Sequence, residues 1–226
     1  MLSISIVFSL WVILSLIVWT SVSSDIVMLV WSFFGLLSVL LSVLCLYFVD
    51  VFIEKKDISL AKKIILGVIC VPAIFFTPTV HNLGGFNLIS CDCSGFEEKY
   101  FTNYYYAVGF LVFIWILILG IYKFMKVSKD FRSQILLLVS GVELFLFSFF
   151  LTGFLASYLA NKGLIGDFGL EFYGLFGMAF FMGMLAFMIV KFKTFHIKLL
   201  GVQALVVTLV VLIGSQFAFI RNNTNK

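Results

Sequence analysis

The residues with the clearest potential for chemistry are two cysteines separated by one residue, Cys91 and Cys93, which follow His81. Thiolate sulfur and imidazole nitrogen are ligands that zinc and other soft metals prefer in proteins. A structural zinc site usually contains two spaced pairs of ligands, and this segment provides one pair. The sequence therefore leaves three alternatives open: a metal site, a disulfide, or two ordinary thiols in an oxidising compartment.

A carboxylate inside a long apolar run is the second distinctive feature. Glu143 lies about 12 Å along the run 135–160, at ~1.5 Å per helical residue, and so falls within the hydrocarbon of a bilayer. A charge there costs roughly 2.5–3.5 kcal/mol on insertion scales, so the side chain should face other helices and be paired or protonated. We predict Gln203 and Thr208 as its partners. The contact would be either a structural hydrogen bond between helices or a switch that changes protonation when a signal arrives.

Catalytic motifs are missing from the sequence. It has no His-Glu-x-x-His pair, no Gly-x-Ser-x-Gly turn and no phosphate-binding loop. A retinal protein would need a lysine deep inside a helix to form the Schiff base, and every lysine here lies between apolar runs or at their ends. We therefore predict that the protein is not an enzyme and needs no cofactor.

The composition is typical of an integral membrane protein. Hydrophobic residues make up 63% of the sequence and charged residues 12%, against about 25% charged residues in an ordinary soluble domain. A membrane-spanning helix needs roughly 20 mostly apolar residues, whereas a barrel strand needs about 10 of alternating polarity. Seven long apolar runs fit the helical pattern: 4–20, 26–53, 64–80, 104–122, 135–160, 172–190 and 199–220. We predict an all-α membrane protein, with residues 1–226 forming a single bundle of seven transmembrane helices.

The positive charges predict the orientation of this bundle. Most lysines and arginines fall in the connections after the second, fourth and sixth runs, and such connections are cytoplasmic by the positive-inside rule. The N-terminus should then be cytoplasmic, while the loop 81–103 and the C-terminus, residues 221–226, should be external. The expected location is the cytoplasmic or inner membrane. The net charge of +4 is dispersed and does not favour a nucleic acid as partner.

The first apolar run has a second interpretation as a secretion signal, because the small residues 21–24 follow it. No lysine or arginine precedes the run, and it is longer than the roughly 7–15 apolar residues of a signal core. These two features favour a membrane helix.

Prolines and small residues should shape two of the helices. Pro72 and Pro78 lie in the third run, and each removes a helical N–H group, which predicts kinks. In the sixth run, Ala179 and Gly183 are four residues apart and would allow another helix to approach closely. The methionines of this run could instead line an adaptable site for a small hydrophobic ligand: Met178, Met182, Met184 and Met188.

Several segments resemble the N-terminal seven-helix sensory region of bacterial membrane histidine kinases. The segment Phe192-Lys-Thr-Phe-His-Ile-Lys198 is similar to the basic and aromatic segment at the membrane edge in that family, with His196 in place of the usual Asp or Asn. The resemblance extends to Phe8-Ser-Leu-Trp11 with Trp19, to Thr77-Pro-Thr-Val80, and to Lys129–Gly141 with Gln134. It covers nearly the whole chain, but the first helix of the family and its kinase core have no counterpart in this sequence.

This resemblance implies a membrane-embedded sensory or signal-input module without a catalytic domain. Its partners would be the lipid bilayer, another membrane protein or a kinase, and a small hydrophobic ligand. A small transporter or channel is the first alternative, and it would require inverted repeats or broken helices with polar groups at the membrane midplane. A structural membrane subunit is the second alternative, and a gene fragment is the third.

Overall fold

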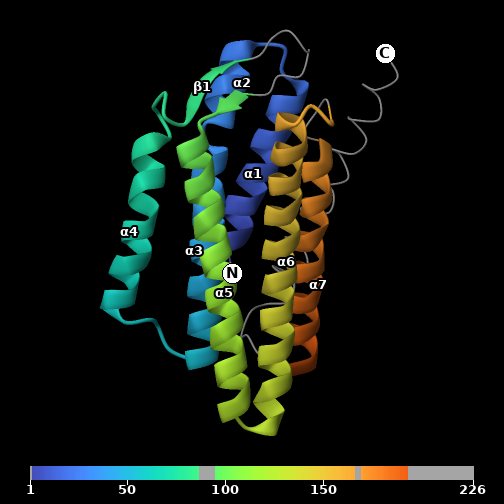
Figure 1. Cartoon of the computed structure of the whole chain (residues 1–226). Helices are drawn as coiled ribbons and strands as arrows, with labels where there is room; N and C mark the ends of the chain where they lie inside the picture. Colours follow the sequence, from blue (N-terminus) through green and yellow to red (C-terminus); the bar gives the residue numbers. More distant parts are fainter. Residues whose placement is uncertain (1, 87–94, 166–168, 193–226) are drawn as a thin grey trace.

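The structure is a bundle of long helices capped at one end by a short hairpin (Figure 1). The computed structural model describes residues 2–86, 95–165 and 169–192. The helices are α1 (Leu2–Thr20), α2 (Ser24–Trp31), α3 (Phe34–Glu54), α4 (Leu60–Phe76), α5 (Lys99–Lys126), α6 (Lys129–Asn161) and α7 (Leu175–Phe192), with a 3₁₀ helix, η1 (Gly169–Gly174), leading into α7. The hairpin consists of the antiparallel strands β1 (Leu83–Phe86) and β2 (Gly95–Glu97).

Five segments of the described residues are helical, long and apolar enough to cross a membrane. They are Ser3–Thr20, Ser24–Glu54, Lys99–Lys126, Phe131–Ala160 and Gly169–Phe192. This is the pattern of a multi-pass helical membrane protein, as the sequence predicts. The predicted third span forms α4, which has only 17 residues. The predicted seventh span, 199–220, lies outside the described residues, so a bundle of seven helices remains a prediction.

The core is built around aromatic side chains from three helices. Phe8 of α1, Phe145 of α6 and Phe181 of α7 are all buried. The ring centroids of Phe8 and Phe145 lie 5.6 Å apart, and those of Phe145 and Phe181 lie 5.9 Å apart. Such ring pairs add to the energy of burial, so they fix α1 against the α6–α7 pair.

The close contact between α6 and α7 is made at two glycines. A Cβ atom at Gly177 would lie 1.9 Å from the Ser148 Oγ atom, and one at Gly174 would lie 2.4 Å from the Thr152 Oγ1 atom. By contrast, Gly183 has no neighbouring atom within 4 Å among the described residues. The helix therefore meets α6 through Gly174 and Gly177, whereas Gly183 lies on its exposed face and Ala179 is half-buried.

The helix boundaries correct two further predictions. The second apolar run is divided into α2 and α3, because the chain turns at Ser32, whose hydroxyl donates to the carbonyl oxygen of Leu29 at 2.7 Å. The α4 helix ends at Phe76, so Pro72 lies inside the helix and Pro78 lies just beyond it. Pro78 is therefore not a kink, and it follows a helix end because the residue before a proline disfavours helical geometry.

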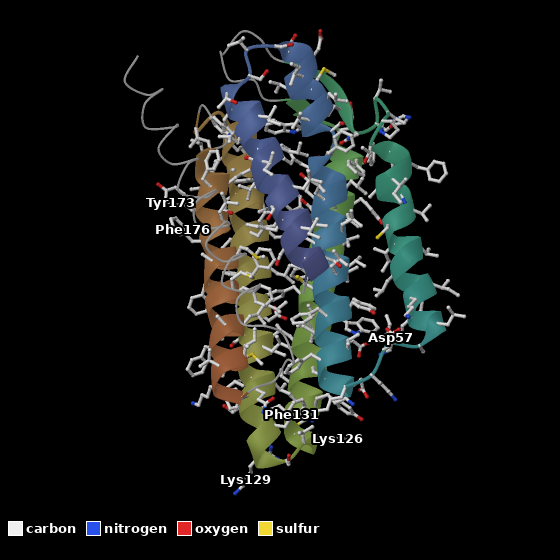
Figure 2. The ribbon with its side chains drawn as sticks, turned by 180° about the vertical axis from the view of Figure 1, so that it is seen from behind. Asp57, Lys126, Lys129, Phe131, Tyr173 and Phe176 are labelled. Atoms are coloured by element: carbon white, nitrogen blue, oxygen red, sulfur yellow. The ribbon has the colours of Figure 1, made fainter. Side chains whose placement is uncertain are left out.

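One end of the bundle carries the described basic connections. The α3–α4 and α5–α6 connections and the last turn of α7 lie at this end, which we call the basic end (Figure 1). Figure 2 shows Lys126 and Lys129 at the basic end and Tyr173 and Phe176 toward the opposite end. The β1–β2 hairpin also lies at the opposite end, in the predicted loop 81–103, and α5 begins there at Lys99 rather than at residue 104.

Candidate functional site

The α4 helix is the part of the bundle that packs most loosely. It buries Cys70 and Ala73, while most of its apolar side chains are exposed. Figure 1 shows α4 standing at the outer edge, beside α3 and α5. Three polar contacts connect it to the remaining helices, one near its first turn, one in its middle and one just after its end.

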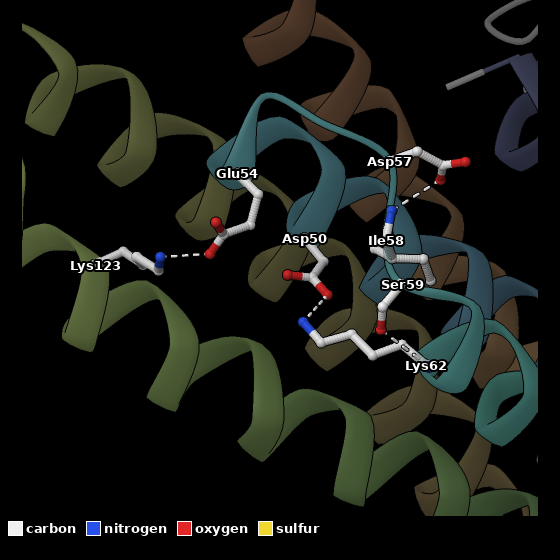
Figure 3. A network of polar contacts seen from close by, with 7 residues as sticks. All are labelled: Asp50, Glu54, Asp57, Ile58, Ser59, Lys62 and Lys123. Atoms are coloured by element: carbon white, nitrogen blue, oxygen red, sulfur yellow. Dashed lines mark hydrogen bonds and ion pairs between the residues drawn. The ribbon is translucent and has the colours of Figure 1, made fainter.

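The first contact is an ion pair between α3 and α4 (Figure 3). The Lys62 Nζ atom donates to the Asp50 Oδ2 atom at 2.6 Å. The Asp50 side chain is 8% exposed and the Lys62 side chain 49% exposed, so the carboxylate is buried and the ammonium reaches outward. Ser59 caps α4 by accepting the main-chain N–H of Lys62 on its hydroxyl, which orients the first turn of the helix.

Two neighbouring ion pairs hold the basic end in place. Glu54 of α3 pairs with Lys123 of α5 (Figure 3), and Asp57 in the α3–α4 connection pairs with Lys63 of α4. The Asp57 carboxylate also accepts the hydroxyl of Tyr47 at 2.9 Å. The Lys63 ammonium and, next, the Tyr47 hydroxyl lower the pKa of Asp57, and the same carboxylate raises the pKa of Lys63.

The second contact lies at a weak point of the α4 helix. Pro72 has no N–H group to donate to the carbonyl of Val68, so the preceding turn lacks one helical hydrogen bond. The hydroxyl of Tyr104, on α5, donates to the carbonyl oxygen of Ile69 in this same turn. A side chain that hydrogen-bonds the backbone next to a proline compensates for the lost helical bond, which matters most where no water is present.

The third contact fixes the chain beyond the end of α4. The amide group of Asn82 is buried and donates to the carbonyl oxygens of Ser32 at 2.8 Å and Thr77 at 3.0 Å. It thereby connects the α2–α3 turn to the last turn of α4.

Between the first two contacts lies a cavity of about 520 Å³, bounded by α3, α4 and α5. Asp50 and Lys62 line it at the basic end and Tyr104 lines it on the other side, while the remaining wall is apolar. Its size falls within the roughly 300–1,000 Å³ of small-molecule sites, and a few polar groups on an apolar wall are typical of such sites. We call it the α4 cavity.

Only one of the two carboxylate oxygens of Asp50 accepts a hydrogen bond from a described residue. Its Oδ2 atom accepts from Lys62, but its Oδ1 atom is buried and has no hydrogen-bond partner within residues 2–86, 95–165 and 169–192. Leaving such an acceptor unpaired costs about 1–3 kcal/mol, or more for a charged group. The Asp50 Oδ1 atom at the edge of the cavity is therefore a candidate acceptor for a hydrogen bond from a ligand.

Glu143, which the sequence singled out, occupies a separate site. The residue is 7% exposed, and neither carboxylate oxygen has a hydrogen-bond partner in the part of the chain that the structure describes. It lines a second cavity of about 500 Å³, between α5 and α6, whose wall is otherwise almost entirely apolar. Its predicted partners, Gln203 and Thr208, lie outside the described residues.

The predicted metal ligands are not brought together within the described residues. His81 is exposed there, with its ring 6.1 Å from that of Phe76, and Cys91 and Cys93 lie outside the described part of the chain. No group of three or more His, Cys, Asp or Glu residues in the described ranges is arranged to hold a metal ion.

Asp50 is not among the residues that the sequence singled out. The useful signal is its spacing from Lys62 across the short α3–α4 connection. Two antiparallel helices joined by a short loop bring residues at equal distances from the loop to the same depth. Applying this rule would have placed Asp50 and Lys62 side by side.

Comparisons with known proteins returned no match among protein-family models, curated proteins or solved structures. The functional argument therefore rests on the site itself.

Proposed function

We propose that this protein is a membrane-embedded signal-input module, in which α4 changes position when a ligand occupies the α4 cavity. The observation that carries the proposal is the attachment of α4. An apolar helix is held by three polar contacts over a cavity, so a ligand can push it without disturbing the aromatic core. The resemblance to the sensory region of histidine kinases supports the same class of function.

The movement of α4 would be transmitted to a partner protein at the basic end. A shift of α4 acts directly on the Lys62–Asp50 pair and on the α3–α4 connection, which lies beside the Glu54–Lys123 pair. We propose that this end is cytoplasmic, following the positive-inside rule, and that it contacts another membrane protein or a kinase. A transporter is less well supported, because the two buried carboxylates of the described chain line separate cavities with no shared residue.

Distances between spin labels test the movement of α4. One label on α4 at Val68→Cys and one on α6 at Phe154→Cys report the position of α4, because both side chains are exposed. A control pair at Phe110→Cys and Phe154→Cys reports α5 and α6 alone. All four native cysteines are replaced beforehand.

Filling the cavity serves as a substitute for the ligand. Val112→Phe adds a ring to the buried wall of the α4 cavity, and Val190→Phe adds the same ring on the exposed face of α7. We expect Val112→Phe to change the α4–α6 distance and leave the control distance unchanged, and Val190→Phe to change neither. An α4–α6 distance that is unaffected by the filled cavity would refute the proposed function.

Orientation is tested with a membrane-impermeant thiol reagent. Single cysteines are placed at Ser128, in the α5–α6 connection, and at Leu164, beyond the far end of α6, where the side chain is 70% exposed. In intact cells we expect labelling at Leu164→Cys and not at Ser128→Cys, with both labelled after lysis. The reverse pattern would place the basic end outside and contradict this part of the proposal.

A further inference from the structure

We propose that the ligand of the α4 cavity is an amphiphile with one apolar chain and an uncharged head that donates a hydrogen bond, such as a hydroxyl group. The inference rests on the proposed function, because it specifies the ligand of the same cavity. Three features of the described residues support it: the charge balance at the polar end, the unpaired acceptor, and the length of the apolar wall.

The charge balance favours an uncharged head. Asp50 and Lys62 form one carboxylate–ammonium pair, so the polar end of the cavity has no net charge. The neighbouring carboxylates, Glu54 and Asp57, are each paired with a lysine as well. A charged head would be attracted by one member of this pair and repelled by the other, so it would lose its hydration without gaining a counter-charge.

The unpaired Asp50 Oδ1 atom requires a hydrogen-bond donor in the head group of the ligand. The Asp50 Oδ1 atom is buried beside the cavity and has no partner among the residues that the structure describes, while Lys62 donates to the Oδ2 atom. Because Oδ1 is buried, binding would require neighbouring side chains to move, and we propose that the half-exposed Lys62 side chain is the one that does. A hydroxyl group donates to this oxygen, whereas an ether oxygen of the same size only accepts. The cavity should therefore distinguish an alcohol from its methyl ether.

The apolar wall fits a chain that reaches about halfway across a bilayer. The apolar lining residues of α5 run from Val108 to Ile118, and the lining residues of α4 run from Lys62 to Ile69. At ~1.5 Å per residue these stretches are roughly 15 Å and 10 Å long, compared with about 30 Å for the whole hydrocarbon core. A single chain anchored at Asp50 would extend along this wall.

Photoreactive probes test the inference in the full-length protein, reconstituted in phosphatidylcholine nanodiscs. The first probe is dodecanol with a diazirine in its chain, and the second is the methyl ether of the same molecule. We expect the alcohol to label the lining peptides of α4 and α5 saturably and about tenfold more efficiently than the ether, the effect of one hydrogen bond to a charged acceptor. Asp50→Leu should reduce alcohol labelling to the level of the ether.

A specificity change provides the second variant. Lys62→Gln retains a side chain that donates to Asp50 but leaves the carboxylate charge unbalanced, so the preference should shift from the alcohol to the equivalent dodecylamine probe. Thermal unfolding identifies variants that fail to fold, and Asp50→Leu with Lys62→Met removes both charges if the single variant is unstable. Mass spectrometry of lipids bound to the purified protein tells a resident membrane lipid from an added alcohol.

Equal labelling by the alcohol and the ether, or labelling that Asp50→Leu leaves unchanged, would overturn the inference. That result is separate from a failure of the proposed function. If the alcohol binds as expected but the α4–α6 distance stays constant, the ligand assignment stands and the signal-input function fails. If neither probe labels the lining peptides preferentially, but Val112→Phe changes the α4–α6 distance, the proposed function stands and the ligand class is wrong.

Discussion

The hydroxyl of Tyr104 donates a hydrogen bond to the main-chain carbonyl oxygen of Ile69, one turn before Pro72. A side chain of α5 thus supports the backbone of α4 at the turn that proline weakens. The contact also closes the α4 cavity opposite the Asp50–Lys62 pair. Pro72, the cavity and the attachment of α4 are therefore parts of one arrangement.

We predict that Tyr104→Phe loosens α4 without unfolding the bundle. The substitution removes the donor and keeps the ring, so the expected loss is about 1 kcal/mol, the typical net value of one hydrogen bond. Hydrogen exchange should become faster for the α4 amides and stay unchanged for those of α6. Tyr100→Phe is the matched control, because that side chain is 89% exposed. Equal exchange rates in both variants and the wild type would show that the contact does not hold α4.

The contact between α6 and α7 allows a matched pair of substitutions in one helix. In Gly177→Ala the added Cβ atom would lie 1.9 Å from Ser148 Oγ and 3.1 Å from the backbone of Phe145. We expect a loss of about 1–3 kcal/mol, the usual cost of overpacking. Gly183→Ala meets no described residue within 4 Å and should be neutral or more stable by about 0.5–1 kcal/mol, because alanine favours the helix. Thermal unfolding in detergent compares the two, and the opposite order would contradict this packing.

Much of the fold could be predicted because a bilayer imposes strong constraints on sequence. Each apolar run up to residue 192 forms helix in the structure, since a membrane helix must satisfy its own backbone hydrogen bonds. The boundaries were less predictable. The start of α5 at Lys99 lies among polar and aromatic residues, where hydropathy gives no signal, and the break at Ser32 depends on a local hydroxyl contact.

The candidate site was harder to predict than the fold. Glu143 could be singled out because it is a carboxylate inside an apolar run, and its burial follows from the cost of exposing it to lipid. The α4 cavity could not be predicted in the same way, because it arises from the distance between α4 and its neighbours. That distance depends on Asn82, Tyr104 and Asp50, which lie far apart in the sequence, and no local pattern links them.

The Asp57–Lys63 contact predicts a dependence of stability on acid pH. The pKa of Asp57 is lower in the folded protein, mainly because Lys63 donates to its carboxylate. The contact therefore stabilises the folded state above the unfolded pKa of about 3.9, and the effect is lost as the pH falls through the folded pKa. Because Asp57 is solvent-exposed, the effect should be small and sensitive to salt. The melting temperature of wild type should decrease more between pH 6 and pH 3 than that of Asp57→Asn. Parallel pH profiles for the two proteins would show that the contact adds nothing.

Glu143 gives the last prediction. Both of its carboxylate oxygens are buried and have no partner among the described residues, at the edge of an apolar cavity between α5 and α6. Glu143→Leu should therefore stabilise the protein, by about 1–3 kcal/mol, because it replaces an unsatisfied polar group with apolar contacts. Glu143→Gln should gain little, because the amide keeps unsatisfied polar atoms. Ser140→Ala on the same cavity wall is the control and should change the stability by less than about 0.5 kcal/mol. Unfolding in detergent measures all three. A loss of stability in Glu143→Leu would contradict this prediction and favour the hydrogen bond to Gln203 or Thr208 that the sequence predicts, and Thr208→Val combined with Glu143→Leu would then show no additional loss.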